Sequence, residues 1–325
     1  MTKPSPEQFV SAGKVAAAMR AEIAKALIGQ PEVIDSVLCA LLAGGHVLIE
    51  GVPGLGKTLL VKALARTISG SFGRIQFTPD LMPADVTGHT LYDPKNQVFT
   101  ARRGPVFVNL LLADEINRAP AKTQAALLEV MQEAQVTIEG DAHRLEPPFM
   151  VLATQNPIEQ EGTYALPEAQ LDRFLLKVTI DYPSQADELA MVRHVTEGKV
   201  GDRLEVEQVA SLVKPSTVVS LQAIAASVAA DDAVLDYAIR LMRATRAWAG
   251  VVAGAGPRGA ISLVRAARAA ALLAGRDYVT PDDVKKMALP ALRHRIMPSP
   301  ELELEGRGTD AILKGLLDKI EAPRK

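Results

Sequence analysis

The sequence has little cysteine, few aromatic residues and no long apolar run. Cys39 is the one cysteine among 325 residues, so the chain cannot form an internal disulfide. We expect this thiol to be buried and inert within its apolar helical surroundings. Aromatic residues make up 4% of the chain, so Leu, Val, Ile and Ala must form most of the core. The longest apolar stretches are too short or carry charge, which argues against a membrane-inserted helix.

An excess of charge of either sign is also absent. Lys and Arg together number 36, Asp and Glu number 38, and the net charge is −2. This balance argues against a strongly basic nucleic-acid-binding protein, although a local basic patch remains compatible with it. The first eight residues are polar and contain proline, without the apolar core of a signal peptide. We therefore expect a cytoplasmic protein.

The chain does contain a complete phosphate-binding loop at residues 51–58, GVPGLGKT. This segment fills the pattern G-x-x-x-x-G-K-[ST] at every fixed position. Its glycines allow backbone N–H groups to turn inward around a polyphosphate. Lys57 can reach the β- and γ-phosphates, and the Thr58 hydroxyl can ligate Mg²⁺. The predicted contacts to the nucleotide come from Gly51, Val52, Pro53, Gly54, Leu55, Gly56, Lys57, Thr58 and Leu59.

The segments around this loop alternate between short apolar runs and helical patterns. We expect strands at 46–50, 73–77, 106–112, 149–153 and 175–180, and alternation of this kind predicts an α/β fold with a mainly parallel sheet. From about residue 184 almost only helical patterns follow. The sequence therefore predicts a flexible N-terminus at 1–12, an α/β nucleotide-binding core at 13–183 and an all-helical domain at 184–325.

Two acids, Asp114 and Glu115, follow one of the expected strands. In a phosphate-loop fold, the carboxyl end of a central strand lies beside the loop. Asp114 is then placed to hold the Mg²⁺ shell, and Glu115 to polarise an attacking water, which would make the protein a hydrolase. The alternative is an ordinary strand-to-loop junction with solvated acids, and it is the preceding loop that favours the catalytic interpretation.

Three further residues are candidates for the same chemistry. Asn156 follows another apolar strand and could orient the attacking water, although an Asn-Pro pair is equally typical of a turn. Arg173, at the end of a short helix, could stabilise transition-state charge on a γ-phosphate in a neighbouring subunit. Arg258 opens a helix of the second domain and could fold back onto the γ-phosphate as that domain closes. For both arginines the alternative is a solvated or salt-bridged surface charge.

The order of these motifs resembles that of the AAA+ ATPases, and more narrowly that of the MoxR family. The resemblance covers most of the chain and rests on GGHVLIEG at 44–51, FTPDLMPADVTG at 77–88, LLADEINRAP at 111–120, ATQNPIE at 153–159 and EAQLDRF at 168–174. It implies an AAA+ P-loop NTPase core with a parallel sheet flanked by helices, and a smaller all-α C-terminal lid. It also implies ATP and Mg²⁺ as ligands and a homo-oligomer, usually a hexameric ring.

The resemblance assigns a role to each candidate residue. Asn156 matches sensor 1, Arg173 matches the arginine finger that acts on the neighbouring subunit, and Arg258 matches sensor 2 of the lid. Ile28 and Gly29 match the segment that packs near the adenine.

The same resemblance implies further contacts between subunits and with partners. Arg118 is an additional candidate for facing the neighbouring subunit's nucleotide. Two insertions, at 85–103 and 136–147, point towards the ring face or pore in relatives and are candidate partner contacts. Simple surface hairpins are the alternative for both.

The leading functional hypothesis is an ATP-driven, chaperone-like remodeller or maturation factor for protein complexes. The resemblance implies a partner with a von Willebrand factor A domain. A nucleic-acid-stimulated ring ATPase is an alternative that the charge balance disfavours. A nucleotide-switch scaffold is a further alternative, against which Glu115 and Arg173 argue. A small-molecule kinase would not explain the helical second domain.

Overall fold

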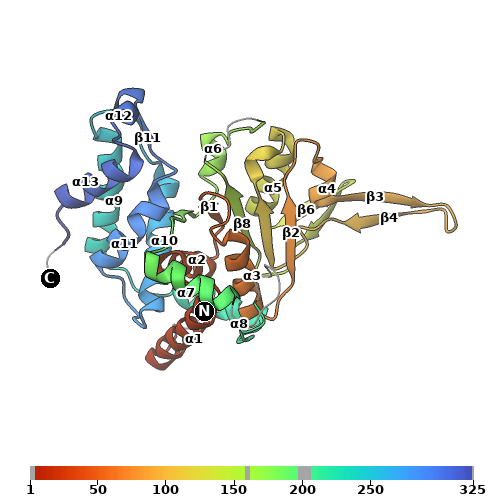
Figure 1. The fold of residues 1–325 in the computed structure, drawn as a ribbon, viewed down its shortest axis with the longest axis horizontal. Coiled ribbons are helices and arrows are strands. Elements are labelled where there is room, and N and C mark those ends of the chain that lie inside the picture. The colour runs from red at the N-terminus through yellow and green to blue at the C-terminus, as the bar shows by residue number, and fades with distance from the viewer. Residues whose placement is uncertain (1–3, 158–161, 197–205, 324–325) are drawn as a thin grey trace.

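The computed structural model describes residues 4–157, 162–196 and 206–323. At its centre lies a five-stranded sheet in the order β2-β5-β8-β1-β9 (Figure 1). These strands are β1 (Val47–Glu50), β2 (Phe72–Gln76), β5 (Leu110–Asp114), β8 (Met150–Gln155) and β9 (Leu176–Thr179). Every pairing in the sheet is parallel, so the predicted α/β fold with a parallel sheet is confirmed.

The central strands send alternate side chains into two separate apolar cores. Leu110 and Leu112 of β5 belong to the core that also contains α1 (Pro6–Ala26), α2 (Pro31–Leu42) and α3 (Lys57–Thr67). Leu111 and Ala113 belong to the core on the opposite face, beneath α5 (Ala121–Glu133). Because side chains alternate along a strand, a continuous apolar run is what a sheet covered on both faces requires.

Strand β5 begins at Leu110 and not at residue 106, where the apolar pattern placed its start. The preceding residues form a tight turn in which the Val108 N–H donates to the Val106 carbonyl at 2.8 Å. Val106 is fully buried, so it contributes to the apolar signal without belonging to a strand. The turn is followed directly by the strand that carries Asp114 at its end.

The first helix includes residues that we predicted to be flexible. Helix α1 begins at Pro6, where Ser5 and Gln8 form a capping box. Its buried residues include Phe9, Ala12, Ala16, Met19 and Ile23, which repeat at intervals of three and four. That spacing forms one apolar stripe, and α1 packs with it against α3. Residues 6–12 of the predicted N-terminal segment therefore belong to helix α1.

The segment after residue 184 is helical in its described parts, apart from one short strand pairing. The helices are α7 (Gln185–Thr196), α8 (Pro215–Ala226), α9 (Asp232–Ala247), α10 (Pro257–Leu273), α11 (Pro281–Leu292), α12 (Pro300–Leu304) and α13 (Thr309–Lys319). Strand β10 (Val251–Ala253) pairs antiparallel with β11 (Met297–Pro298). Helix α10 packs on α1 and α2. The C-terminal helices thus share one apolar core with the N-terminal ones, across the boundary predicted at 183–184.

Two β-hairpins occupy the predicted insertions. The first, β3 (Gly88–Asp93) with β4 (Val98–Arg103), follows the short helix α4 (Pro83–Thr87) and extends away from the body of the molecule (Figure 1). The second pairs β6 (Gln135–Ile138) with β7 (Asp141–Arg144) after α5. A short 3₁₀ helix (Ile116–Arg118) and α6 (Glu168–Leu171) complete the described elements. Within the described ranges, no helix has the length and apolarity needed to cross a bilayer.

His46 connects three elements of the core and should make the fold sensitive to acid. Its Nδ1 accepts from the Val151 N–H at 2.9 Å, and its Nε2 donates to the Met131 carbonyl at 3.0 Å, so the ring is held neutral. Burial lowers its pKa from 6.5 to about 4. Because the folded-state pKa lies below the unfolded value, this stability is complete above about pH 6.5. It falls by up to about 3 kcal/mol as the pH drops towards 4.

Denaturant unfolding at successive pH values from about 7.5 down to about 4.5 tests this expectation. The free energy of unfolding should fall more steeply with acid in the wild type than in His46→Gln, whose side chain has no proton to gain in this range. Equal slopes in the two proteins would remove His46 from the acid response.

Candidate nucleotide site

The phosphate loop connects β1 to α3 at the carboxyl edge of the sheet. Gly54 and Gly56 have φ of 86° and 80°, a left-handed backbone that favours glycine. No atom lies within 4 Å of the position a Cβ would take at Gly54, so open space remains above the loop. Lys57 Nζ donates to the Gly51 carbonyl at 2.7 Å, which folds its side chain back over the loop. Gly56 caps the start of α3, so the first N–H groups of that helix are available to an anion.

An apolar pocket adjoins the loop, and Gly54, Leu55 and Gly56 line part of it. Ile28, a predicted adenine-side residue, lines it together with Met191 and Val195 of α7. Gly29 packs directly against α7, because a Cβ there would come within 2.7 Å of the Asp187 Cβ. Sequence reasoning did not identify the α7 residues. Their spacing of four along a predicted helical segment was the available signal.

Asp114 ends the inner strand β5 and is 8% exposed. Its Oδ1 accepts from the Thr154 hydroxyl at 2.6 Å, and its Oδ2 accepts from Arg74 Nη2 at 2.7 Å. Asp114 and the Thr58 hydroxyl are hard oxygen donors of the kind that Mg²⁺ prefers. In the part of the chain that the structure describes, no group of three or more His, Cys, Asp or Glu could hold a metal unaided. Mg²⁺ would therefore fit here with phosphate oxygens and water completing its shell.

Glu115 has an unusual backbone for its residue type. Its φ of 55° lies in the left-handed region, where non-glycine residues are uncommon and often functional. Its N–H donates to the Thr154 hydroxyl at 2.8 Å, and its Oε2 accepts from Gln76 at 2.8 Å and from Arg118 at 3.2 Å. Arg118, which we considered as a contact to a neighbouring subunit, pairs here with the glutamate of its own chain.

Sequence reasoning missed three polar residues that hold these acids: Arg74, Gln76 and Thr154. The register of β2 on β5 places Gln76 opposite Asp114, and Ala113 lies opposite Ala153 on β8. Their position at the ends of parallel strands is the signal that could have identified them, since such ends share one edge of the sheet.

Asn156 follows β8 directly and is 4% exposed. The preceding residue, Gln155, accepts a hydrogen bond from the Gly51 N–H at 3.4 Å. The predicted sensor residue thus lies where β8 meets the start of the phosphate loop. Positions 158 and 159 of its motif lie outside the described residues.

The two candidate arginines lie together and apart from the loop. Arg173 and Arg258 line one pocket with Gly44 and Arg265, whereas neither is among the residues that line the pocket at the phosphate loop. Arg258 is 3.7 Å from Asp172, the residue before Arg173. The predicted contact of Arg258 with a γ-phosphate depends on closure of the second domain; in this structure Arg258 shares a pocket with Arg173.

The sequence that contains these residues matches known protein families and individual relatives. A model of the ATPase family associated with various cellular activities (AAA) matches residues 46–176, and a model of the AAA lid domain matches residues 243–315. Chaperone MoxR1 of Mycobacterium tuberculosis is 41% identical over 314 residues, 93% of this chain and 81% of that protein. The chain belongs to the MoxR family of AAA ATPases.

Two further comparisons extend this relation to MoxR-family proteins and to the fold. Protein MoxR of Methylorubrum extorquens is 31% identical and covers 99% of both chains. A crystal structure of a Cytophaga hutchinsonii protein has a TM-score of 0.88 and 42% identity, with 98% of each chain covered. Membership of this ATPase family implies ATP hydrolysis. The AAA match includes the phosphate loop, both acids, Asn156 and Arg173, and the lid match includes Arg258.

Proposed function

We propose that this MoxR-family protein hydrolyses ATP with Mg²⁺ at sites shared between the subunits of a ring, and uses the cycle to remodel protein complexes. The observation that carries the proposal is the separation within one chain. The loop and acids lie at the carboxyl edge of the sheet, while Arg173 and Arg258 line a different pocket. An arginine that stabilises a γ-phosphate must touch it, so these arginines are suited to a neighbour's nucleotide.

Each residue then has one role in the reaction. Lys57 and the N-terminus of α3 bind the phosphates, and Ile28 with α7 encloses the base. The Glu115 carboxylate accepts a proton from the attacking water, which the Asn156 amide orients. Bound Mg²⁺, held through Thr58 and Asp114, would neutralise charge on the phosphate oxygens. Arg173 and Arg258 of the adjacent subunit stabilise the charge that develops in the transition state.

The remodelling part of the proposal rests on relatives and on an exposed surface. One relative is named a chaperone. The projecting β3–β4 hairpin exposes Tyr92 and Phe99, whose rings lie 5.1 Å apart between centroids. Exposed apolar side chains on a projecting hairpin are suited to contact a protein, either a client or a partner with a von Willebrand factor A domain. A hexamer is the ring that the family resemblance implies.

The steady-state ATPase rate per subunit, measured against protein concentration with particle size in parallel, tests this proposal. We expect the rate per subunit to rise as the ring assembles, because each site then gains its neighbour's arginines. A rate that is independent of concentration while assembly proceeds would favour a site complete within one chain. Stimulation by single- or double-stranded DNA at modest salt would favour the nucleic-acid motor.

A further inference from the structure

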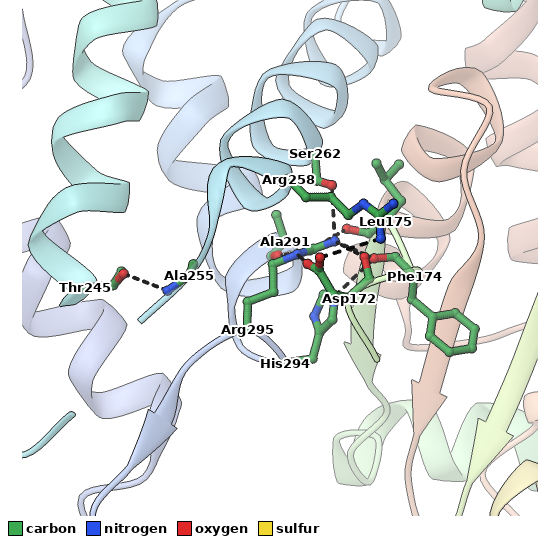
Figure 2. Close-up of polar contacts among 10 residues, drawn as sticks. All are labelled: Asp172, Phe174, Leu175, Thr245, Ala255, Arg258, Ser262, Ala291, His294 and Arg295. Atoms are coloured by element: carbon green, nitrogen blue, oxygen red, sulfur yellow. Dashed lines mark hydrogen bonds and ion pairs between the residues drawn. The ribbon is translucent and has the colours of Figure 1, made fainter. Parts of the chain in front are cut away.

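Arg295 is a buried charged residue immediately beside the two candidate arginines. It follows α11, and 2% of its side chain is exposed. Its Nε donates to Asp172 Oδ1 at 2.7 Å. Figure 2 shows the guanidinium between α10 and the segment that follows α6. Burial lowers the pKa of Arg295, and the Asp172 carboxylate counteracts that effect.

Every nitrogen of this guanidinium is used as a donor. Besides the Asp172 carboxylate, it binds the carbonyls of Asp172 at 3.1 Å, Phe174 at 2.6 Å and Leu175 at 3.2 Å. It also binds the Ser262 hydroxyl of α10 at 3.1 Å and the Ala291 carbonyl of α11. An arginine has five N–H donors in a rigid plane, so these acceptors define one orientation of the segment 172–175 relative to the lid.

The clamped residues lie on both sides of Arg173. Arg295 binds the carbonyl before Arg173 and the two carbonyls after it, and its carboxylate partner also faces Arg258 at 3.7 Å. No carboxylate in the described part of the chain forms an ion pair with Arg173 itself. Arg295 therefore fixes the position of the Arg173 backbone, and with it the point from which the Arg173 side chain extends.

The segment that leads into α10 is fixed by a hydrogen bond of its own. The Ala255 N–H donates to the Thr245 hydroxyl at 3.0 Å (Figure 2). A Cβ on Gly259 would lie 3.1 Å from the Arg295 Cδ, so α10 and Arg295 are in close contact one residue after Arg258. A shift of the lid would consequently move both arginines.

We propose that Arg295 is a positioning residue for hydrolysis in the neighbouring subunit: it ties the lid to Asp172, and thereby sets where Arg173 and Arg258 are presented. This inference rests on the proposed shared site. Arg295 does not touch the nucleotide, and acts through the residues that do.

Substituting Arg295→Met tests the proposal, with Arg276→Met as the matched control. Arg276 also pairs with a buried lid carboxylate, that of Asp283, but it contacts neither Asp172 nor Arg173. We expect Arg295→Met to lower kcat by about 10- to 100-fold, because a misplacement of about 1 Å is enough for such a loss. Its KM for ATP and ring size should change by less than about twofold, since its own loop is intact. Arg276→Met should retain kcat within about twofold.

Mixed rings separate positioning from damage to the fold. Lys57→Ala subunits have no functional loop but keep a correctly placed Arg173. Arg295→Met subunits keep a functional loop but present Arg173 incorrectly. In an equal mixture about a quarter of the interfaces would combine the intact halves, so activity should recover well above that of either variant alone. A merely structural role for Arg295 would leave the mixture inactive.

A second mixture, of Lys57→Ala with Arg173→Ala, tests the shared site separately from the positioning role of Arg295. Recovery in that mixture without recovery for Arg295→Met overturns the positioning role and keeps the shared site. No recovery in either mixture overturns the shared site.

If Arg295→Met does not assemble, Asp172→Asn takes its place, because this change keeps the acceptor shape and removes the charge that both Arg295 and Arg258 face. Full kcat in assembled Asp172→Asn would likewise overturn the positioning role.

Discussion

Replacing Glu115 with Gln should abolish ATP turnover while leaving ATP bound. The side chain keeps its length and can still accept from Gln76, but it can no longer take a proton from water. Loss of a general base costs about 10² to 10⁴ in rate. Steady-state phosphate release measures the loss, and the nucleotide that stays with the protein after rapid desalting measures the trapped ATP.

The control for this change is Glu303→Gln, on the exposed helix α12 far along the chain from the acids. It removes the same charge and should retain wild-type turnover. Unchanged turnover in Glu115→Gln would take Glu115 out of the mechanism and would favour a different base or a nucleotide switch.

Replacing Arg173 with Ala should lower the ATPase rate of the assembled ring by about 10³-fold or more, the range observed when an arginine finger is absent. The physical reason is that a cation next to the γ-phosphate stabilises charge that develops only in the transition state. Nucleotide affinity should change little, because the loop that binds ATP belongs to the other subunit. Equilibrium binding of a fluorescent ATP analogue, with ring size measured in parallel, separates the two effects.

The matched control is Arg240→Ala. Arg240 is a surface arginine that pairs with Asp236 four residues earlier on α9, and its loss should leave the rate unchanged. A rate in Arg173→Ala equal to that of the wild type, with normal assembly, would show that each chain completes its own site. The switch or scaffold interpretation would then be preferred.

Sequence patterns predicted the parallel sheet because strands that are buried on both faces appear in the sequence as short apolar runs. Each expected strand is a short, mostly apolar segment, and each corresponds to a strand of the structure. The start of β5 differs from the prediction, because the strand begins at Leu110 and not at residue 106. Val106 is buried by a turn, and burial alone cannot distinguish a turn from a strand. Helix α1 begins at Pro6, inside the segment predicted as a flexible lead-in, and its apolar stripe from Phe9 to Ile23 has a helical period.

The phosphate loop and the two acids were predictable because their chemistry depends on residues close in sequence. The loop needs glycines at fixed spacings and a lysine, all within eight residues, and Asp114 and Glu115 need only the end of a strand. The residues that hold those acids come from other strands. Thr154, Gln76 and Arg74 reach them only because the sheet order places β2 and β8 on either side of β5.

The sequence by itself determined the family, the parallel core, the loop and the identity of the candidate arginines. Tertiary structure alone decided where those arginines lie. Arg173 and Arg258 are separated along the chain, and they meet because Asp172 is shared by Arg258 and the buried Arg295. No local pattern encodes that meeting, because it depends on the lid helices packing against the end of α6. The physical reason is the buried charge, whose donors need acceptors from three elements that only folding brings together.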